Sequence, residues 1–393
     1  MKYSGLLLVA CVAIFSSSEA APLVRNNSGR PIPDSYIVVL KDGHKVADFI
    51  PKFDAIAKRQ NDRGRKPTID RQYRKLQGFS ATVNPAALKE LLASEEVDFV
   101  EQDQIVTIQT LSQSNPPSWG LPRVSERQLD TSAPYYYQNQ AGSGVTAYVI
   151  DTGINTAHIE FGGRASMGAN FISGSANTDE NGHGSHVSGT IGGATYGVAK
   201  KVKLVGVKVL NAQGSGSFSG IVAGMDWVAQ RAAGTKAVVN MSLGGGKSQA
   251  VDSATTRLYN AGIPTIVAAG NDGNADACNG SPSGASGSFT IAASDINDRI
   301  ASFSSWGQCV DIFGPGVDIT SAWIGSSYAI NTISGTSMAT PHVVGVAALL
   351  LSSDPSLTSA QAVYNKLAQT ATRDAIGGYL RGSPNLLVYN GAV

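Results

Sequence analysis

The stretch around which the fold is organised is Asn331-Thr332-Ile333-Ser334-Gly335-Thr336-Ser337-Met338-Ala339-Thr340-Pro341-His342. The apolar run that follows it, Val343 to Leu351, predicts a buried helix. Because proline is tolerated in the first turn of a helix, Pro341 indicates that this helix begins near Thr336 or Ser337. The hydroxyl of Ser337 then lies among backbone N–H groups that have no intrahelical partner, where negative charge is stabilised. On this stretch alone, a helix-capping role explains Ser337 equally well.

Two earlier stretches favour a catalytic role for this serine. The apolar segment Val145–Gly153 ends in Asp151 and a glycine turn, and Asn181–Thr190 places His183 among glycines before a second helix of small residues. Asp, His and Ser in this chain order form one of the three known orders of a catalytic triad. A serine hydroxyl is a weak nucleophile at neutral pH and needs a base, and that base needs an orienting carboxylate.

With these motifs, the chain resembles the subtilisin-like serine proteases, or subtilases, and within them the fungal proteinase K branch. The resemblance covers nearly the whole chain, and its motifs occur in order: Val149–Gly153, Gly182–Thr190, Ser242–Gly245, Ala268–Asn271 and Gly335–His342. It implies that Asp151, His183 and Ser337 form a triad that hydrolyses peptide bonds through an acyl-enzyme.

The resemblance also implies an oxyanion hole and a substrate cleft. Asn271 is expected to donate to the oxyanion together with the backbone N–H of Ser337, although Asn271 also suits a simple turn. Peptide is expected to bind as an added strand. The cleft residues implied are Gly214, Ser215, Gly216, Ser242, Leu243, Gly244 and Gly245. The small residues Ala268, Ala269 and Gly270 leave room for a large apolar or aromatic P1 side chain, with broad specificity otherwise.

From Val145 onward, apolar strands with little alternation are separated by helical segments. This pattern predicts an α/β fold with a mostly parallel central sheet and helices on both faces. Asp151, Ser242 and Asn271 each lie at the carboxyl end of a predicted strand, which is where sites gather in such sheets.

Residues 21–110 predict a separate, small α+β domain. Strands are expected at 35–40, 75–83 and 97–108, with helices at 49–61, capped by Asp48 with Pro51 in the first turn, and at 85–94. This is close to a ferredoxin-like β-α-β-β-α-β order. The domain resembles the pro-segment of the family, which would serve as an intramolecular inhibitor. The alternative is an accessory domain that stays attached. The Ser-, Asn- and Pro-rich stretch 110–118 marks the boundary, so a peptidase domain at 111–393 is expected, with self-cleavage near 110–112.

The first 20 residues read as a secretory signal, with Lys2, an apolar run from Leu6 to Phe15 and a cleavage site after Ala20. That run is too short to span a bilayer, and no later stretch is expected to span one. The net charge of +1 gives no case for binding nucleic acid or anionic membranes. The protein is therefore expected to be a secreted, soluble monomer.

Three further expectations concern covalent and metal chemistry. Cys278 and Cys309 remain after signal removal and are expected to form a disulfide; the alternative is two buried thiols. Asn26 begins a glycosylation pattern. No catalytic cofactor is expected, but the resemblance implies a structural Ca²⁺ held by Asp311 and carbonyls near 286–288.

Three other classes of protein compete with this interpretation. A non-catalytic protein on the same fold is disfavoured because every position that the chemistry needs carries a suitable residue. An α/β-hydrolase esterase is disfavoured because Ala339 replaces the last glycine of Gly-x-Ser-x-Gly. A zinc protease is disfavoured by the lack of His-Glu-x-x-His in the sequence.

Overall fold

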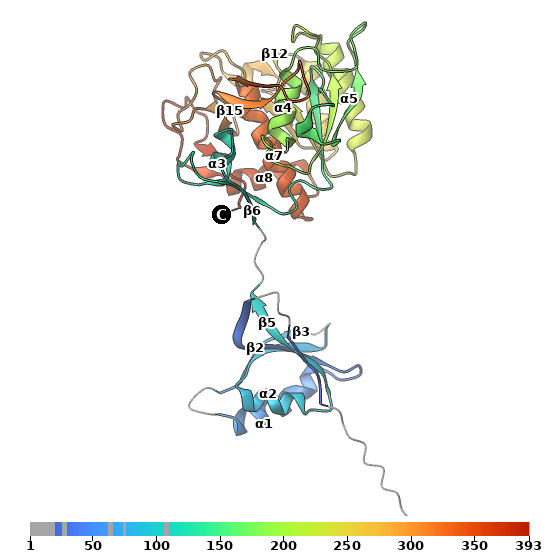
Figure 1. Ribbon diagram of the computed structural model, residues 1–393, viewed down its shortest axis with the longest axis vertical. Helices are drawn as coiled ribbons and strands as arrows, with labels where there is room; N and C mark the ends of the chain where they lie inside the picture. The colour runs from blue at the N-terminus through green and yellow to red at the C-terminus, as the bar shows by residue number, and fades with distance from the viewer. Residues whose placement is uncertain (1–19, 26–29, 62–65, 74–75, 106–109, 393) are drawn as a thin grey trace, which may run out of the picture. The chain divides into compact units, whose positions relative to one another are not determined.

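The computed structural model describes residues 20–25, 30–61, 66–73, 76–105 and 110–392, in two compact units, 1–108 and 109–393 (Figure 1). The predicted signal segment before Ala20 and the glycosylation candidate Asn26 lie outside the described residues. The strand that begins at Thr110 pairs within the C-terminal unit, and the position of the cleaved bond stays a prediction.

The N-terminal unit is a five-stranded sheet of order β1-β5-β2-β4-β3 with two helices. Its elements are β1 (Leu23–Val24), β2 (Arg30–Leu40), α1 (Val46–Arg59), β3 (Thr68–Tyr73), β4 (Gly78–Thr82), α2 (Pro85–Leu92) and β5 (Val97–Ile105). From β2 to β5 the order is the predicted β-α-β-β-α-β; β3 itself had no sequence prediction. Phe49 and Phe53 of α1 pack on Phe79 of β4, with ring centroids 5.8 and 5.5 Å apart.

In this unit, the predicted start of α2 agrees with the structure and the predicted start of α1 does not. Asn84 caps α2 as its position predicts, since its Oδ1 accepts the N–H of Ala87 at 2.9 Å. The predicted start of α1 was wrong. The carbonyl of Lys45 accepts the N–H groups of both Asp48 and Phe49, so the helix starts at Val46. Asp48 is therefore inside the first turn rather than at the cap, and Pro51 is one turn further in.

The C-terminal unit is built on a nine-stranded sheet of order β19-β20-β16-β15-β13-β11-β8-β10-β9, in which only β19 and β20 pair antiparallel. Its strands are β8 (Thr146–Asp151), β9 (Ala165–Asn170), β10 (Lys203–Lys208), β11 (Ala237–Met241), β13 (Thr265–Ala268), β15 (Ser288–Ser294), β16 (Ile312–Pro315), β19 (Thr372–Arg373) and β20 (Leu386–Leu387). Its longer helices are α4 (His183–Gly192), α5 (Phe218–Ala232), α6 (Gln249–Asn260), α7 (Thr336–Ser353) and α8 (Ala360–Thr370). Short elements complete it: β6 (Thr110–Gln113), α3 (Gly120–Ser125), β7 (Tyr135–Gln138), η1 (Ile159–Phe161), β12 (Gly245–Gly246), η2 (Ala277–Asn279), β14 (Gly280–Ser281), β17 (Ile319–Ala322) and β18 (Ile330–Ile333).

Each central strand of this sheet contributes to two cores. In β8, Ala147 and Val149 join the core of α4 and α7, whereas Tyr148 and Ile150 join the core of α5 and α6. This follows from the alternation of side chains along a strand, and all four positions are apolar because both faces are covered. The predicted α/β sheet with helices on both faces is confirmed.

Helix α7 departs from the sequence predictions in two ways. Its 18 residues are long and apolar enough to match a membrane span, contrary to expectation, but 83% of the helix is buried inside the unit, as in the core helix of a soluble protein. It starts at Thr336 as predicted, which puts Pro341 in the second turn rather than the first. Pro341 lacks the N–H that would bond to the carbonyl of Ser337. That carbonyl instead accepts the hydroxyl of Ser242 at 2.8 Å, which explains why the proline is tolerated.

Candidate active site

The predicted site residues meet at the carboxyl edge of the sheet. Asp151 is the last residue of β8, Ser242 follows β11, and Asn271 lies three residues after β13. These three strands are direct neighbours and parallel, so their carboxyl ends share one edge. Helices α4 and α7 begin with His183 and Thr336 respectively, and they supply the remaining two predicted side chains, His183 and Ser337.

Asp151 and His183 form the central hydrogen-bonded pair. The Nδ1 of His183 lies 2.8 and 3.0 Å from the two carboxylate oxygens of Asp151, which is fully buried. The backbone N–H of Thr152 also donates to this carboxylate, at 2.7 Å. Burial disfavours the imidazolium of His183, but the negative charge and hydrogen bond of Asp151 outweigh it, so the pKa of His183 is raised above its ordinary value.

A second buried carboxylate, Asp179, connects the two loops that carry this pair. Its Oδ1 accepts the hydroxyl of Thr152 at 2.8 Å and the N–H of Gly182 at 2.9 Å. Its Oδ2 accepts both the N–H and the hydroxyl of Ser185, at 2.8 and 2.7 Å. Asp179 therefore ties the end of β8 to the first turn of α4, and its charge adds to the raised pKa of His183.

Ser337 lies in the first turn of α7 and exchanges hydrogen bonds with Ser242. Its hydroxyl donates to the carbonyl of Ser242 at 3.1 Å, and the hydroxyl of Ser242 donates to the carbonyl of Ser337 at 2.8 Å. The buried amide of Asn240 donates to the Ser242 hydroxyl at 3.1 Å. The residue after β11 thus fixes the start of α7, and Ser242 itself lines the same cavity as His183. Without bound substrate, catalytic hydrogen bonds are often long or misaligned, so this hydroxyl orientation is compatible with a later bond to His183.

The side chain of Asn271 is oriented by Thr336. Its Oδ1 accepts the N–H and the hydroxyl of Thr336 at 2.8 and 2.9 Å, which directs the Nδ2 donor to the other side. A carbon added to Gly335 would lie 3.5 Å from that Nδ2 and 3.6 Å from the backbone nitrogen of Ser337. Two donor nitrogens therefore lie near one point beside Gly335, a placement that is compatible with an oxyanion hole.

Two adjoining cavities of about 490 and 450 Å³ flank this space. They share Leu243, Gly244 and Gly245. The first cavity also contains Ala268, Ala269, Gly270, Asn271 and Ser337, and the second also contains His183, Gly214, Ser215, Gly216 and Ser242. All ten predicted substrate-binding residues therefore line one cavity or the other.

The remaining two histidines near the site are buried and held elsewhere. The Nε2 of His186 lies 2.9 Å from the carbonyl of Ile319, and the Nδ1 of His342 lies 2.8 Å from the carbonyl of Met338. Burial lowers the pKa of each to about 4. Both are neutral packing residues near pH 7, in agreement with the sequence interpretation, which did not choose either as a base.

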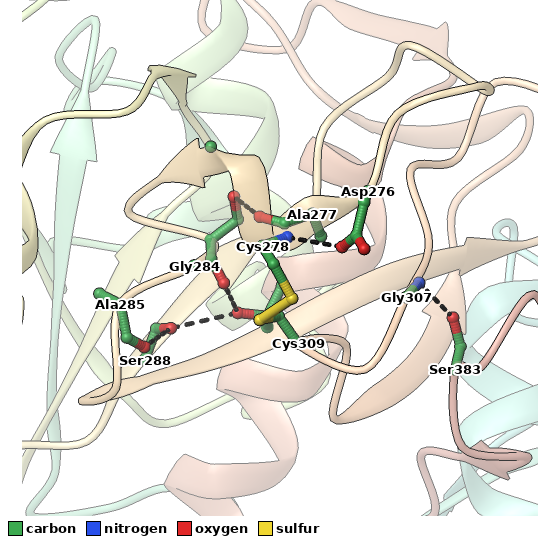
Figure 2. The surroundings of a disulfide bond; sticks show 12 residues. Asp276, Ala277, Cys278, Gly284, Ala285, Ser288, Gly307, Cys309 and Ser383 are labelled. Carbon is green, nitrogen blue, oxygen red and sulfur yellow. Dashed lines mark hydrogen bonds between the residues drawn. A yellow bond between two sulfur atoms is a disulfide. The ribbon is translucent and has the colours of Figure 1, made fainter.

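The predicted disulfide is present. Cys278 and Cys309 are bonded, with Cα atoms 5.2 Å apart, and Figure 2 shows the bond beside Ala277 and Gly284. Cys278 is in η2, where Asp276 accepts its N–H at 2.9 Å. Because Ala277, Asn279 and Gly280 line the first cavity, the disulfide anchors one wall of that cavity.

The predicted calcium ligand, Asp311, lies at the entry to β16. One carboxylate oxygen accepts the N–H of Thr290 at 2.7 Å, and burial raises the pKa of Asp311 to about 6. Among the described residues, no group of three or more His, Cys, Asp or Glu side chains converges as a metal cluster. A half-buried carboxylate that accepts one backbone N–H fits a hard cation that takes its other ligands from backbone oxygens and water.

Sequence reasoning missed several residues of the site. Thr152 and Asp179 were not predicted, although Asp179 stands four residues before His183 and a buried acid near a candidate base is a usable signal. The cavity walls formed by residues 275–280 and by Ser283 were also missed. They come from an irregular loop whose position depends on the disulfide and on contacts with β12.

Comparison with known proteins supports this interpretation. Residues 142–384 match the model of the subtilase family, and residues 35–109 match that of the peptidase inhibitor I9. A cuticle-degrading serine protease of Arthrobotrys oligospora is 42% identical over 413 residues, covering 100% of both chains. An alkaline serine exoprotease A of Vibrio alginolyticus is 45% identical over 91% of this chain and 68% of its own. The crystal structure of a cold-adapted subtilisin-like serine proteinase is 49% identical, with a TM-score of 0.67, over 70% of this chain and 98% of its own. Together with the fold, these similarities establish that the chain belongs to the subtilase family of serine endopeptidases and carries an I9 pro-domain.

Proposed function

We propose that the protein hydrolyses internal peptide bonds through a triad of Asp151, His183 and Ser337. The hydroxyl oxygen of Ser337 attacks the scissile carbonyl while His183 accepts its proton at Nε2. His183 then returns this proton to the leaving amine, which yields an acyl-enzyme and the first product. A water molecule, deprotonated by the same imidazole, attacks the ester and releases the second product. Asp151 keeps the Nδ1–H tautomer and stabilises the imidazolium.

The observation that carries this proposal is the pairing of the buried Asp151 carboxylate with His183, in a cavity that adjoins the one lined by Asn271 and Ser337. The Nδ2 of Asn271 and the N–H of Ser337 border the space where the oxyanion would form. Both donors are fixed before substrate arrives, because Thr336 holds the amide of Asn271 and α7 holds the backbone of Ser337. Preorganised donors of this kind stabilise the tetrahedral intermediate without reorganisation.

Substrate is proposed to lie extended along the glycine-rich segments 214–216 and 242–245. Main-chain hydrogen bonds to these segments would be indifferent to side-chain identity, which gives broad specificity. The cavity behind Ala268, Ala269 and Gly270 would accept a large apolar or aromatic P1 side chain. Faster cleavage after Lys or Arg than after Phe or Leu would refute this preference.

The chain is proposed to be a secreted, self-processing zymogen that acts as a monomer. The I9 pro-domain would inhibit the peptidase unit until cleavage near residues 110–112. A relative from Thermus that carries the name extracellular serine proteinase is 42% identical over 99% of this chain, and it supports export.

The test is the intact mass of the secreted product for the wild type and for Ser337→Ala. The proposal predicts that the wild type loses the pro-domain and that the variant keeps it covalently joined. If both lose it at the same bond, another protease does the processing. A wild type that cleaves no peptide substrate would instead favour a non-catalytic protein on this fold.

A structural calcium ion is proposed at Asp311, with backbone carbonyls from about residues 286–288. The carboxylate would be the only charged ligand there, and the ion would stabilise the strands rather than take part in the reaction. No catalytic cofactor is proposed.

A further inference from the structure

The ammonium group of Lys247 is surrounded by oxygen atoms that the sequence interpretation did not foresee. Its Nζ lies 3.1, 3.3 and 3.1 Å from the backbone carbonyl oxygens of Cys278, Gly280 and Gly284. It also lies 3.1 Å from a carboxylate oxygen of Asp252, at the start of α6. One positive charge is thus shared by three carbonyls and one carboxylate.

This is the ligand chemistry of a hard cation, with an ammonium group in the position of a metal ion. The surrounding backbone is shaped around it. A carbon added to Gly284 would lie 2.6 Å from Nζ and 2.3 Å from the carbonyl oxygen of Cys278, so a larger residue would not fit. The carboxylate is also oriented, because the hydroxyl of Ser281 donates to its other oxygen at 2.6 Å.

The two segments that Lys247 joins are adjacent parts of the lining of the larger cavity. Gly245 and Gly246, immediately before Lys247, contribute to this lining, and so do Asn279, Gly280 and Ser283. The two segments pair through the two-residue ladder of β12 and β14, and the N–H of Ser248 donates to the hydroxyl of Ser281 at 2.9 Å. Glycine-rich strands of this length are weakly ordered on their own, because glycine loses the most conformational freedom on folding.

We propose that Lys247 acts as a built-in cation that holds this part of the cavity lining in the arrangement that a large P1 side chain requires. It is a positioning residue for specificity and takes no part in bond breaking. A large side chain uses the full depth of the cavity and depends on that arrangement, whereas a small one does not. The inference rests on the proposed peptidase function and names a determinant of its substrate preference.

The ion pair with Asp252 contributes little to this role. The side chain of Lys247 is 49% exposed, and an exposed ion pair is weak in water. The contacts with the carbonyls contribute more, because carbonyls that face one another repel unless a cation lies between them. Asp252→Asn is therefore expected to leave the preference for a large P1 residue largely unchanged.

The test compares Lys247→Ala with the wild type on two peptide substrates that differ only in Phe or Ala at P1. For the Phe substrate, kcat/KM is expected to fall about tenfold through KM, the size of effect of losing one charge-assisted hydrogen bond. The kcat/KM for the Ala substrate and the kcat for both substrates are expected to change by less than about twofold, which is smaller than the effect of losing one such hydrogen bond. Lys203→Ala is the matched control, because Lys203 is exposed and begins β10, at the amino ends of the parallel strands, away from the site. This variant is expected to leave kcat and KM for both substrates unchanged.

A second arm of the experiment identifies the charge as the cause. Methylammonium, added at constant ionic strength, is expected to restore the Phe preference of Lys247→Ala and to leave the wild type unaffected. An unchanged Phe-to-Ala ratio in an active Lys247→Ala variant would overturn the inference. If sodium restores the Phe preference as well as methylammonium does, the result supports a site for cations in general. If neither cation restores the Phe preference, the role of Lys247 as a built-in cation is overturned. A wild type without peptidase activity would instead overturn the proposed function.

Discussion

The buried ion pair of Arg123 and Asp298 offers a direct test of how the C-terminal unit is held together. Arg123, on α3, is fully buried, and its Nε and Nη2 donate to the two oxygens of Asp298 at 2.7 and 3.0 Å. Its Nη1 donates to the carbonyl of Glu126. Asp298 has a positive φ of 56°, a conformation that asparagine tolerates as well as aspartate. Asp298→Asn therefore removes the charge and leaves the backbone preference intact.

The expected loss follows from the burial of the guanidinium. Removing one partner of a buried pair costs about 3–5 kcal/mol, because the remaining charge is left uncompensated. With an unfolding entropy of about 2.1 cal/mol/K per residue, a unit of roughly 280 residues unfolds with about 0.6 kcal/mol/K. The melting temperature should therefore fall by about 5–8 °C.

The assay is scanning calorimetry of the full chain in a Ser337→Ala background, which prevents self-digestion, at one scan rate. Asp374→Asn is the matched control, because Asp374 is exposed and has nearly the same φ, 57°. That variant should melt within about 1 °C of its parent, as surface substitutions usually do. If Asp298→Asn melts no lower than Asp374→Asn, the ion pair does not stabilise the unit and the reasoning is wrong.

Four further predictions follow from the site and its surroundings. Asn271→Leu should lower kcat about 10²- to 10³-fold with little change in KM, the range measured for the corresponding donor in subtilisin; an effect confined to KM would contradict an oxyanion role. Because the pKa of His183 is raised and the base must be neutral, activity should rise with pH to a midpoint above about 6.5, and a pH–rate profile with a lower midpoint would contradict the assignment. Replacing Cys278 and Cys309 with Ser should lower the free energy of unfolding by about 3–4 kcal/mol in the chain-entropy model for a loop of 31 residues, as measured by denaturant titration. The pKa of Asp311 is raised to about 6, so calcium-free protein should lose stability as pH rises from about 4, the ordinary pKa of an aspartate, to about 6, and Ca²⁺ should restore it. A melting temperature at alkaline pH that a chelator leaves unchanged would exclude the ion.

The site was largely predictable because its residues stand in short, local patterns. Asp151 ends an apolar run, and Ser337 precedes another, so each could be assigned to the end of a strand or the start of a helix. Parallel strands bring such ends to one edge. The bounds of α5 are also marked locally, by a capping serine, Ser217, and by an apolar stripe along the helix. The start of α1 was missed, because Lys45 offers no capping side chain that a sequence pattern could reveal.

By itself, the sequence determined the class of fold, the triad candidates with their chain order, and the presence of a separate small N-terminal domain. These follow from periodicity and from residue chemistry within a few positions. Only the tertiary structure decided the orientation of Asn271 by Thr336, the cage around Lys247 and the pairing of Arg123 with Asp298. In these three cases the partners are 65, 31 and 175 residues apart along the chain. Hydrogen bonds depend on distance and direction to within a fraction of an ångström, and no local pattern carries that information across such separations.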